Sequence, residues 1–306
     1  MKRFILVFVI LIFSCYSDKS KSIKDSTTIF EKSDGHETAT YEETIQFYSN
    51  LAERFKEISF REIGETDSGK PLHLVTYNSD AEFDFESIRK DKRIILINNG
   101  IHPGESDGID ATMMFFRDIV TGKIRAPEKT VLATIPIYNV GGSLNRNSTT
   151  RTNQNGPNEY GFRGNARNYD LNRDFIKSDT KNARTFAQIF HLVKPDLFID
   201  THVSNGADYQ YAITHLFTQH LKMGGKLGEY IHKTMQPTVE AKMSEKGLDI
   251  TPYVNVFNQV PEKGFSQYLD LPRYSTGYTT LFNTLGLMIE THMLKPYKQR
   301  VGATYE

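Results

Sequence analysis

Three short, uninterrupted apolar segments constrain the fold of this chain more than any other feature. They are Ile94–Ile97, Leu197–Ile199 and Leu287–Ile289. Runs of this length are typical of strands buried on both faces of a sheet. Helical spacing of apolar residues recurs between them, at Asp107 to Val120, 179–193 and 221–246. Strands that alternate with helices predict an α/β sheet covered by helices on both faces.

Other segments extend this pattern. Thr40 and Glu43 form a capping-box pattern at the start of a predicted helix. Residues 58–66 and 72–77 are predicted to pair as a hairpin, and Val131 to Tyr138 forms a further strand. The stretch from Gly141 to Asp174 is polar and has little apolar periodicity, so we expect a long irregular segment there.

The N-terminus is predicted to lie outside the folded domain. Phe4 to Phe13 is apolar and follows Met1-Lys2-Arg3. Ten helical residues rise about 15 Å, half of a bilayer core, so the run is typical of a signal peptide. Ser14-Cys15 then resembles a bacterial lipoprotein cleavage box. We therefore expect a signal peptide at 1–14, a lipidated Cys15 with a flexible tether at 15–39, and a catalytic domain at 40–306.

This organisation predicts a location. Lipidation of Cys15 would anchor the protein in a bacterial cell envelope, facing the periplasm or the cell surface. Without lipidation the same signal peptide would give a secreted protein. Membrane association is therefore expected through the lipid anchor and not through a spanning helix.

Charge and cysteine content exclude several classes of protein. The chain has 37 Lys and Arg against 37 Asp and Glu, so it lacks the basic excess of a nucleic-acid-binding protein. Its one cysteine, Cys15, excludes a disulfide scaffold and a structural zinc site made of thiolates. Any zinc in the folded domain must therefore be bound by histidine and carboxylate.

Such side chains follow the three buried strands. His102 and Glu105 come just after the first, separated by Pro103-Gly104, which favours a tight turn. His202 ends the second strand and Glu290 ends the third. Because sites in α/β sheets form at the carboxyl ends of strands, these residues are candidate ligands for a catalytic zinc. An ordinary structural role for each histidine and carboxylate is the alternative interpretation.

Between these strands lies a basic, amide-rich segment. It contains Arg163, Arg167 and Arg173 within eleven residues. Guanidinium groups in a non-helical segment suggest anion binding. A solvated basic loop is the alternative.

Taken in order, these motifs resemble those of the zinc carboxypeptidase family, the carboxypeptidase A-like metallopeptidases. The resemblance covers roughly residues 40 to 300 and is carried by four segments, His102-Pro103-Gly104-Glu105, Asn165-Ala166-Arg167 with Asp170-Leu171-Asn172-Arg173-Asp174-Phe175, Asp200-Thr201-His202, and Glu290. It implies a single α/β domain with a twisted mixed parallel and antiparallel sheet flanked by helices on both faces. It also implies a metallocarboxypeptidase that hydrolyses the C-terminal peptide bond with a zinc-activated water.

The resemblance assigns a metal site. His102, Glu105 and His202 match the residues that bind one zinc ion per chain. Asp170 matches the aspartate that orients the first histidine, a contact that fixes its tautomer. Glu290 matches the general base.

It also assigns the substrate contacts. Asn172 and Arg173 match the pair that binds the terminal carboxylate, for which a guanidinium fork is suited. Arg163 best matches the arginine that polarises the scissile carbonyl, and Arg167, Arg151 and Arg146 remain candidates. Tyr274 is the candidate for the tyrosine that closes over substrate, with Tyr278 and Tyr268 as alternatives. The expected substrates are peptides or muropeptides with a free C-terminal carboxylate.

Two other functions stay open at this point. A zinc amidohydrolase of the same fold would act on acyl-amino acids or peptidoglycan peptides. A non-catalytic binding lipoprotein would use the scaffold without hydrolysis, since fold does not prove function.

Overall fold

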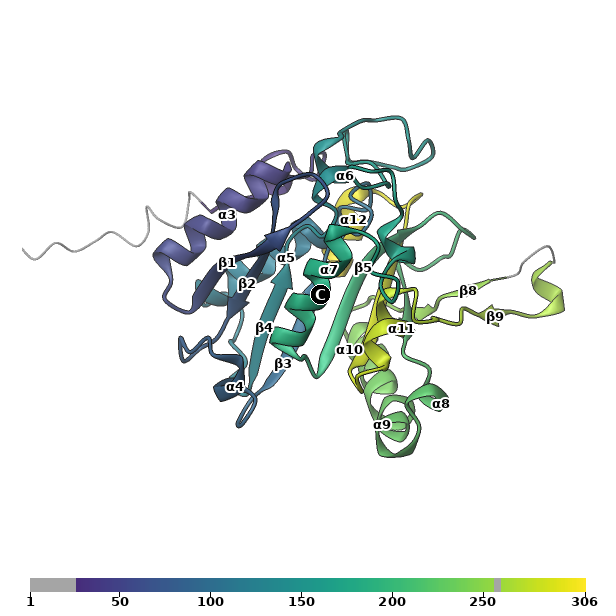
Figure 1. The fold of residues 1–306 in the computed structure, drawn as a ribbon. Coiled ribbons are helices and arrows are strands. Elements are labelled where there is room, and N and C mark those ends of the chain that lie inside the picture. Colours follow the sequence, from purple (N-terminus) through teal and green to yellow (C-terminus); the bar gives the residue numbers. More distant parts are fainter. Residues whose placement is uncertain (1–25, 256–259) are drawn as a thin grey trace, which may run out of the picture.

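An eight-stranded mixed sheet runs through the centre of the protein, whose computed structural model describes residues 26–255 and 260–306 (Figure 1). Its strands lie in the order β1-β2-β4-β3-β5-β10-β6-β7. Their bounds are β1 Ile58–Glu65, β2 Pro71–Tyr77, β3 Arg93–Asn98, β4 Thr130–Ile135, β5 Leu197–Ser204, β6 Ile213–Phe217, β7 Thr251–Pro252 and β10 Leu285–His292. A separate pair, β8 Val254–Asn255 and β9 Ser266–Gln267, forms an arm that projects from the body.

The strands at the centre of the sheet determine where polar side chains meet. β4, β3, β5 and β10 are consecutive parallel neighbours, and they contain the three apolar runs of the sequence. β1, β2 and β6 pair antiparallel, which makes the sheet mixed. Because β3, β5 and β10 run in the same direction, their carboxyl ends meet at one edge. The predicted α/β fold with a mixed sheet is confirmed.

Helices cover both faces of the sheet. The longer ones are α3 Tyr41–Arg54, α5 Asp107–Val120, α7 Lys181–Val193, α10 Gln236–Glu245 and α12 Tyr297–Tyr305. The shorter ones are α2 Ile29–Lys32, α4 Phe85–Ile88, α6 Val140–Leu144, α8 His220–Met223, α9 Gly225–Tyr230 and α11 Ser275–Thr280, with 3₁₀ turns at Leu171–Arg173 and Pro261–Lys263 and a π-helical turn at Ile231–Met235. In Figure 1, α7 and α11 lie in front of the sheet, and α5 packs behind it against α12.

The main core lies against the sheet and includes an aromatic cluster under α7. Phe186 is in ring contact with Phe175, Phe190 and Tyr278, and all four side chains are buried. Edge-to-face and stacked ring pairs of this kind add about 0.5–1.5 kcal/mol each beyond the burial of their area. This cluster supports the front face of the sheet below the polar edge.

The predicted helix over 221–246 is wrong in one respect, because the segment is broken into α8, α9, the π-helical turn and α10. Gly224 and Gly225 adopt positive φ, which ends α8. Pro237 lies in the first turn of α10 and has no N–H to continue the helical bonding of the preceding turn. The helix from Thr40 and its capping box are confirmed.

Residues 26–39 differ from the expected tether, because they are packed on the domain. Thr28 caps α2 through a capping box, and Phe30 is buried against Tyr297. Glu31 forms an ion pair with Arg117 of α5. Cys15 and the predicted signal peptide lie outside the described residues. Within the part of the chain that the structure describes, no helix is long and apolar enough to cross a membrane.

Candidate metal centre and active site

Two histidines and one glutamate converge at the carboxyl edge of the central strands. The loop after β3 carries His102 and Glu105, and the backbone N–H of Glu105 donates to the carbonyl of His102, which closes the tight turn. His202 lies in the last part of β5. All three side chains are buried, and one ligand atom from each lies within 4.8 Å of the others.

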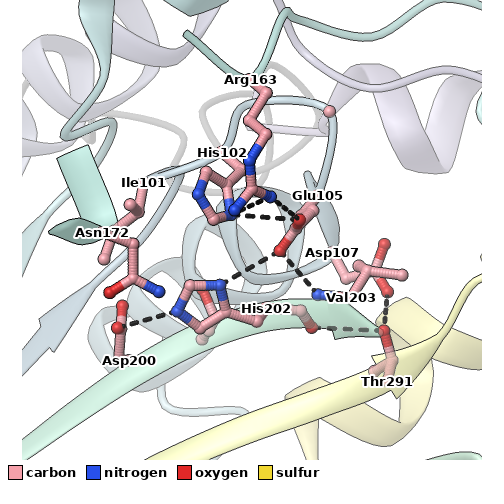
Figure 2. A network of polar contacts seen from close by, with 12 residues as sticks. Ile101, His102, Glu105, Asp107, Arg163, Asn172, Asp200, His202, Val203 and Thr291 are labelled. Carbon is pink, nitrogen blue, oxygen red and sulfur yellow. Dashed lines mark hydrogen bonds and ion pairs between the residues drawn. The ribbon is translucent and has the colours of Figure 1, made fainter. Parts of the chain in front are cut away.

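The hydrogen bonds of the two imidazole rings show which nitrogens face the shared space (Figure 2). Nε2 of His102 lies 3.0 Å from Oδ1 of Asp170. Nε2 of His202 lies 2.9 Å from Oδ2 of Asp200, a contact drawn in Figure 2. The two Nδ1 atoms each lie 3.1 Å from a carboxylate oxygen of Glu105. Two imidazole nitrogens and one carboxylate, with the outer nitrogens held by aspartates, form the donor set of a catalytic zinc site.

Glu105 is held in place by the backbone of β5 and by an arginine of the irregular segment after α6. Its Oε2 accepts a hydrogen bond from the backbone N–H of Val203 at 2.9 Å, and its Oε1 accepts one from Nη1 of Arg151 at 2.9 Å. Burial raises the pKa of Glu105, but the positive charges of His102 and Arg151 outweigh burial and hold it well below its usual range. The site therefore presents a carboxylate and not a carboxylic acid.

Arg163 and Asp170 form the outer rim of this site. Nη2 of Arg163 lies 2.8 Å from Oδ2 of Asp170, and its Nη1 lies 3.2 Å from Nδ1 of His102. Figure 2 shows the guanidinium beside His102 and Glu105. Burial raises the pKa of Asp170, but the hydrogen bond to His102 and the charge of Arg163 lower it by more. The pKa of Asp170 therefore lies below its ordinary value. The Arg163 side chain is 48% exposed, which leaves it accessible to a ligand.

Glu290 lies beside the metal ligands. It is paired in register with His202 across β10 and β5, and it lines the same cavity of about 250 Å³. Removal of its carboxyl from bulk water raises the pKa of Glu290 to about 8, with the charge of Glu105 adding to this and that of His202 opposing it. A carboxyl with such a pKa can accept and return a proton near neutral pH.

The same cavity contains the candidate substrate-binding residues Asn172, Arg173 and Tyr274. The guanidinium carbon of Arg173 lies 4.6 Å from the ring centre of Tyr274. Nη1 of Arg173 donates to the carbonyl of Asn172 at 2.9 Å, and no carboxylate of the described residues pairs with it. Oδ1 of Asn172 is buried and has no hydrogen-bond partner among the residues described. The guanidinium of Arg173 therefore keeps N–H donors for a bound anion, whereas the unpaired Oδ1 of Asn172 is an acceptor and can bind only a donor group.

Three of the alternative candidates lie elsewhere. Arg146 donates to the carbonyl of Glu159, and Arg167 stacks on Tyr169. Tyr278 belongs to the aromatic cluster under α7. Arg151 is close to the site, but it is engaged by Glu105 and by the carbonyl of Val203.

Tyr268, the third tyrosine candidate, lines the cavity and contacts the ring of Tyr274 at 5.0 Å. His292, which shares the strand of Glu290, lies with Nε2 3.3 Å from the carbonyl of Gly206 and outside the cavity lining.

Sequence reasoning assigned no role to several residues of the site, among them Asp200, Tyr253 and Met288. Asp200 binds Nε2 of His202, and Tyr253 and Met288 line the cavity. The spacing of Asp200 and His202 was a usable signal, because residues two apart on a strand point to the same face. Nothing local marks Tyr253, which reaches the site from the loop between β7 and β8.

Comparisons with known proteins agree with this architecture. The model of the family described as zinc carboxypeptidase matches residues 44–196. No curated protein sequence matches the chain. Among solved structures, a metallo-carboxypeptidase from Burkholderia cenocepacia is 16% identical with a TM-score of 0.62, over 87% of this chain and 67% of that one.

Two further structures are similar. A metallo-carboxypeptidase from Pseudomonas aeruginosa is 14% identical with a TM-score of 0.58, over 85% of this chain and 66% of that one. Carboxypeptidase A from Helicoverpa armigera is 11% identical with a TM-score of 0.60, over 87% of this chain and 70% of that one. This chain thus spans about two thirds of the length of the two bacterial structures. At these identities the likeness establishes the fold.

Proposed function

The chain belongs to the zinc carboxypeptidase family, and from this premise we propose that it is a zinc-dependent metallocarboxypeptidase that releases the C-terminal residue of peptides. One observation carries the proposal. The three candidate zinc ligands, the carboxyl of Glu290 and the guanidinium of Arg173 line a single cavity. A metal-dependent carboxypeptidase needs a metal site, a proton acceptor and a group that binds the C-terminal carboxylate of the substrate, all close to one another.

Zinc would be held by Nδ1 of His102, Nδ1 of His202 and the carboxylate of Glu105. When bound, zinc supplies a Lewis acid that brings the pKa of a coordinated water toward about 7. Asp170 accepts a hydrogen bond from Nε2–H of His102, and Asp200 accepts one from Nε2–H of His202. Each ring then has its proton on Nε2 and offers the lone pair of Nδ1 to the metal. Their role is to hold the tautomer and orientation of the two imidazoles.

Glu290 acts as the general base in this proposal. Its carboxyl takes a proton from the attacking water and returns it to the departing amine. Burial makes the Glu290 carboxylate a stronger base than an exposed one, and a cation held by the neighbouring ligands would favour its ionised form.

The remaining residues position the substrate. Arg173 and Asn172 bind the terminal carboxylate, which places the last peptide bond beside the metal site and makes the enzyme an exopeptidase. Arg163 donates to the scissile carbonyl oxygen as negative charge develops on it. Tyr274 covers the bound terminal residue and stacks on Arg173.

A substrate panel tests the proposal. It contains a peptide with a free C-terminus, the same peptide as its amide, an N-acyl amino acid and a muropeptide, each with zinc-loaded and chelator-treated protein. We expect the zinc-loaded protein to cleave the peptide with a free C-terminus but not its C-terminal amide. The chelator-treated protein should cleave neither. Hydrolysis of the acyl-amino acid or muropeptide alone would instead identify the amidohydrolase, and no hydrolysis of any substrate would identify a binding protein.

We also propose that Cys15 is lipidated and anchors the enzyme in a bacterial envelope. Support comes from the order of basic residues, apolar run and Ser14-Cys15 at the N-terminus. Mass spectrometry of the mature protein should show an acylated N-terminal Cys15. The Cys15→Ser variant should be released from the membrane into the soluble fraction. A mature protein with an unmodified N-terminus upstream of Cys15 would contradict the lipid anchor.

A further inference from the structure

Asp200 joins a zinc ligand to a residue outside the zinc site. Its Oδ2 accepts hydrogen bonds from Nε2 of His202, at 2.9 Å, and from the hydroxyl of Ser275. Its Oδ1 accepts one from Nδ2 of Asn98 at 3.2 Å. All four side chains are buried, and Asp200 is 0% exposed. Figure 2 shows Asp200 on the side of His202 that faces away from Glu105.

Ser275 comes from the wall of the substrate cavity. It is the first residue of α11, directly after Tyr274, and both residues line the cavity. Tyr274 contacts Arg173 and Tyr268 through its ring. α11 packs on β5 and β10, the strands that carry His202 and Glu290. The hydroxyl of Ser275 thus connects the substrate-contacting segment with the metal-binding strand.

This hydrogen bond is not an ordinary helix cap. Tyr274 is the N-cap of α11 and makes no side-chain capping bond. The Ser275 hydroxyl donates across the fold to a residue 75 positions away in the sequence. A buried carboxylate that loses a donor has no water to replace it, so the bond is expected to carry more weight than an exposed one.

The two aspartates that hold the imidazoles differ in their access to solvent. The side chain of Asp170 is 28% exposed and also pairs with Arg163. Solvent can therefore compensate for a lost contact there. Asp200 has only buried donors within the described residues, Asn98, His202 and Ser275. The orientation of His202 consequently depends on internal hydrogen bonds alone.

We propose that Ser275 is a positioning residue for zinc, which holds Asp200 and through it the imidazole of His202, and which fixes the wall bearing Tyr274 to the metal site. The inference rests on zinc binding at His102, Glu105 and His202, as in the proposed function. Contacts of this kind behind a metal ligand typically affect affinity by 10–100-fold.

Zinc affinity of the full folded domain, measured by competition with a chelator of known affinity, tests the proposal without an activity assay. We expect Ser275→Ala to weaken zinc binding by about 10-fold. The visible absorption spectrum of the Co²⁺-substituted protein should change in parallel, because it reports ligand geometry. Thr279→Val is the matched control, since Thr279 is a buried hydroxyl on α11 that donates to the carbonyl of Thr276. Its affinity should stay within about 2-fold of wild type.

A double-mutant cycle with Asp200→Asn separates this role from a general effect on folding. If Ser275 acts through Asp200, Ser275→Ala should cost less than about 2-fold in the Asp200→Asn background. An equal loss in both backgrounds, or wild-type affinity and spectrum in Ser275→Ala, overturns the proposal.

Ser275→Cys keeps the volume and donates a weaker hydrogen bond, so it serves if the alanine variant does not fold. Its zinc affinity should fall between those of wild type and Asp200→Asn, and wild-type affinity overturns the proposal. These binding results are independent of substrate. A protein that binds zinc as described but hydrolyses no peptide would contradict the proposed function and leave this inference standing.

Discussion

Glu290 of β10 and His202 of β5 are direct neighbours in register on adjacent parallel strands. The pairing places a carboxyl with a raised pKa beside a zinc ligand, without any contribution from a loop. Side chains on paired strands are held more precisely than side chains on loops. The arrangement suits a proton acceptor that must stay close to the metal site through the catalytic cycle.

Glu290→Gln tests this role. The amide fills the same space but cannot accept a proton, so we expect kcat to fall by about 10²–10⁴-fold. Zinc content should remain one per chain, because Glu290 is not among the three converging ligands. Kinetics on a free-carboxylate peptide and metal analysis check both parts.

The control for this variant is Glu245→Gln, the same change on the exposed side of α10. It should leave kcat within about 2-fold. Undiminished turnover by Glu290→Gln would remove this carboxyl from the mechanism.

Zinc removal should lower both activity and stability. A ligand that binds only the folded state at 1,000 times its Kd adds about 4 kcal/mol to the free energy of unfolding. We therefore expect chelation to lower the Tm and to abolish hydrolysis, with both restored by zinc. Glu105→Gln should lose the zinc-dependent part of the Tm, because a neutral amide replaces a charged ligand. A Tm that is insensitive to zinc in the wild type would contradict the metal site.

Arg173→Lys should weaken binding of the substrate carboxylate. An ammonium cannot make two parallel hydrogen bonds, and hydrogen bonds to charged groups contribute about 1.5–3 kcal/mol. We expect kcat/KM for a free-carboxylate peptide to fall by about 10-fold or more, mainly through KM. Steady-state kinetics provide the measurement.

Arg167→Met is the comparison for this prediction, because Arg167 lies in the same segment but stacks on Tyr169. Its kcat/KM should stay within about 2-fold. Equal losses in the two variants would show that the whole segment is sensitive to substitution and would contradict a specific anchor at Arg173.

The buried carboxyl of Asp110 should make the free energy of unfolding depend on pH. Burial raises the pKa of this carboxyl from 3.8 to about 6 although Tyr297 donates a hydrogen bond to it. Between these values the folded state binds more protons than the unfolded chain, so stability falls as pH rises through this window. Asp110→Asn removes the titration. Relative to wild type it should gain up to about 3 kcal/mol between pH 4 and 7.

Denaturant unfolding at several pH values measures this effect. Tyr297→Phe is the companion variant, because loss of its hydroxyl removes a hydrogen bond that lowers the pKa of Asp110 and should extend the fall in stability to higher pH. A pH dependence that is identical in wild type and Asp110→Asn would show that Asp110 stays ionised throughout the window.

Local sequence patterns were sufficient for much of the architecture. The apolar runs at 94–97, 197–199 and 287–289 became β3, β5 and β10, and the capping box at Thr40 begins α3. The short strand β6 escaped notice, because Ile213 to Phe217 has mixed polarity, and the break at Gly224 was not anticipated. Residues 26–39 looked like a linker by composition, yet Phe30 supplies one buried anchor that packs them on α12.

For the site, motif order and strand-end position predicted residues that the structure brings together at one cavity, since their placement depends on residue type and on the direction of parallel strands. The contacts that hold them could not be obtained in this way. Ser275 meets Asp200 and Arg151 meets Glu105 across 75 and 46 positions of sequence. Such pairs depend on the order of strands in the sheet and on the packing of helices against it, which no local periodicity encodes. The residue types of this centre can thus be predicted from the sequence, whereas their geometry is determined by long-range packing.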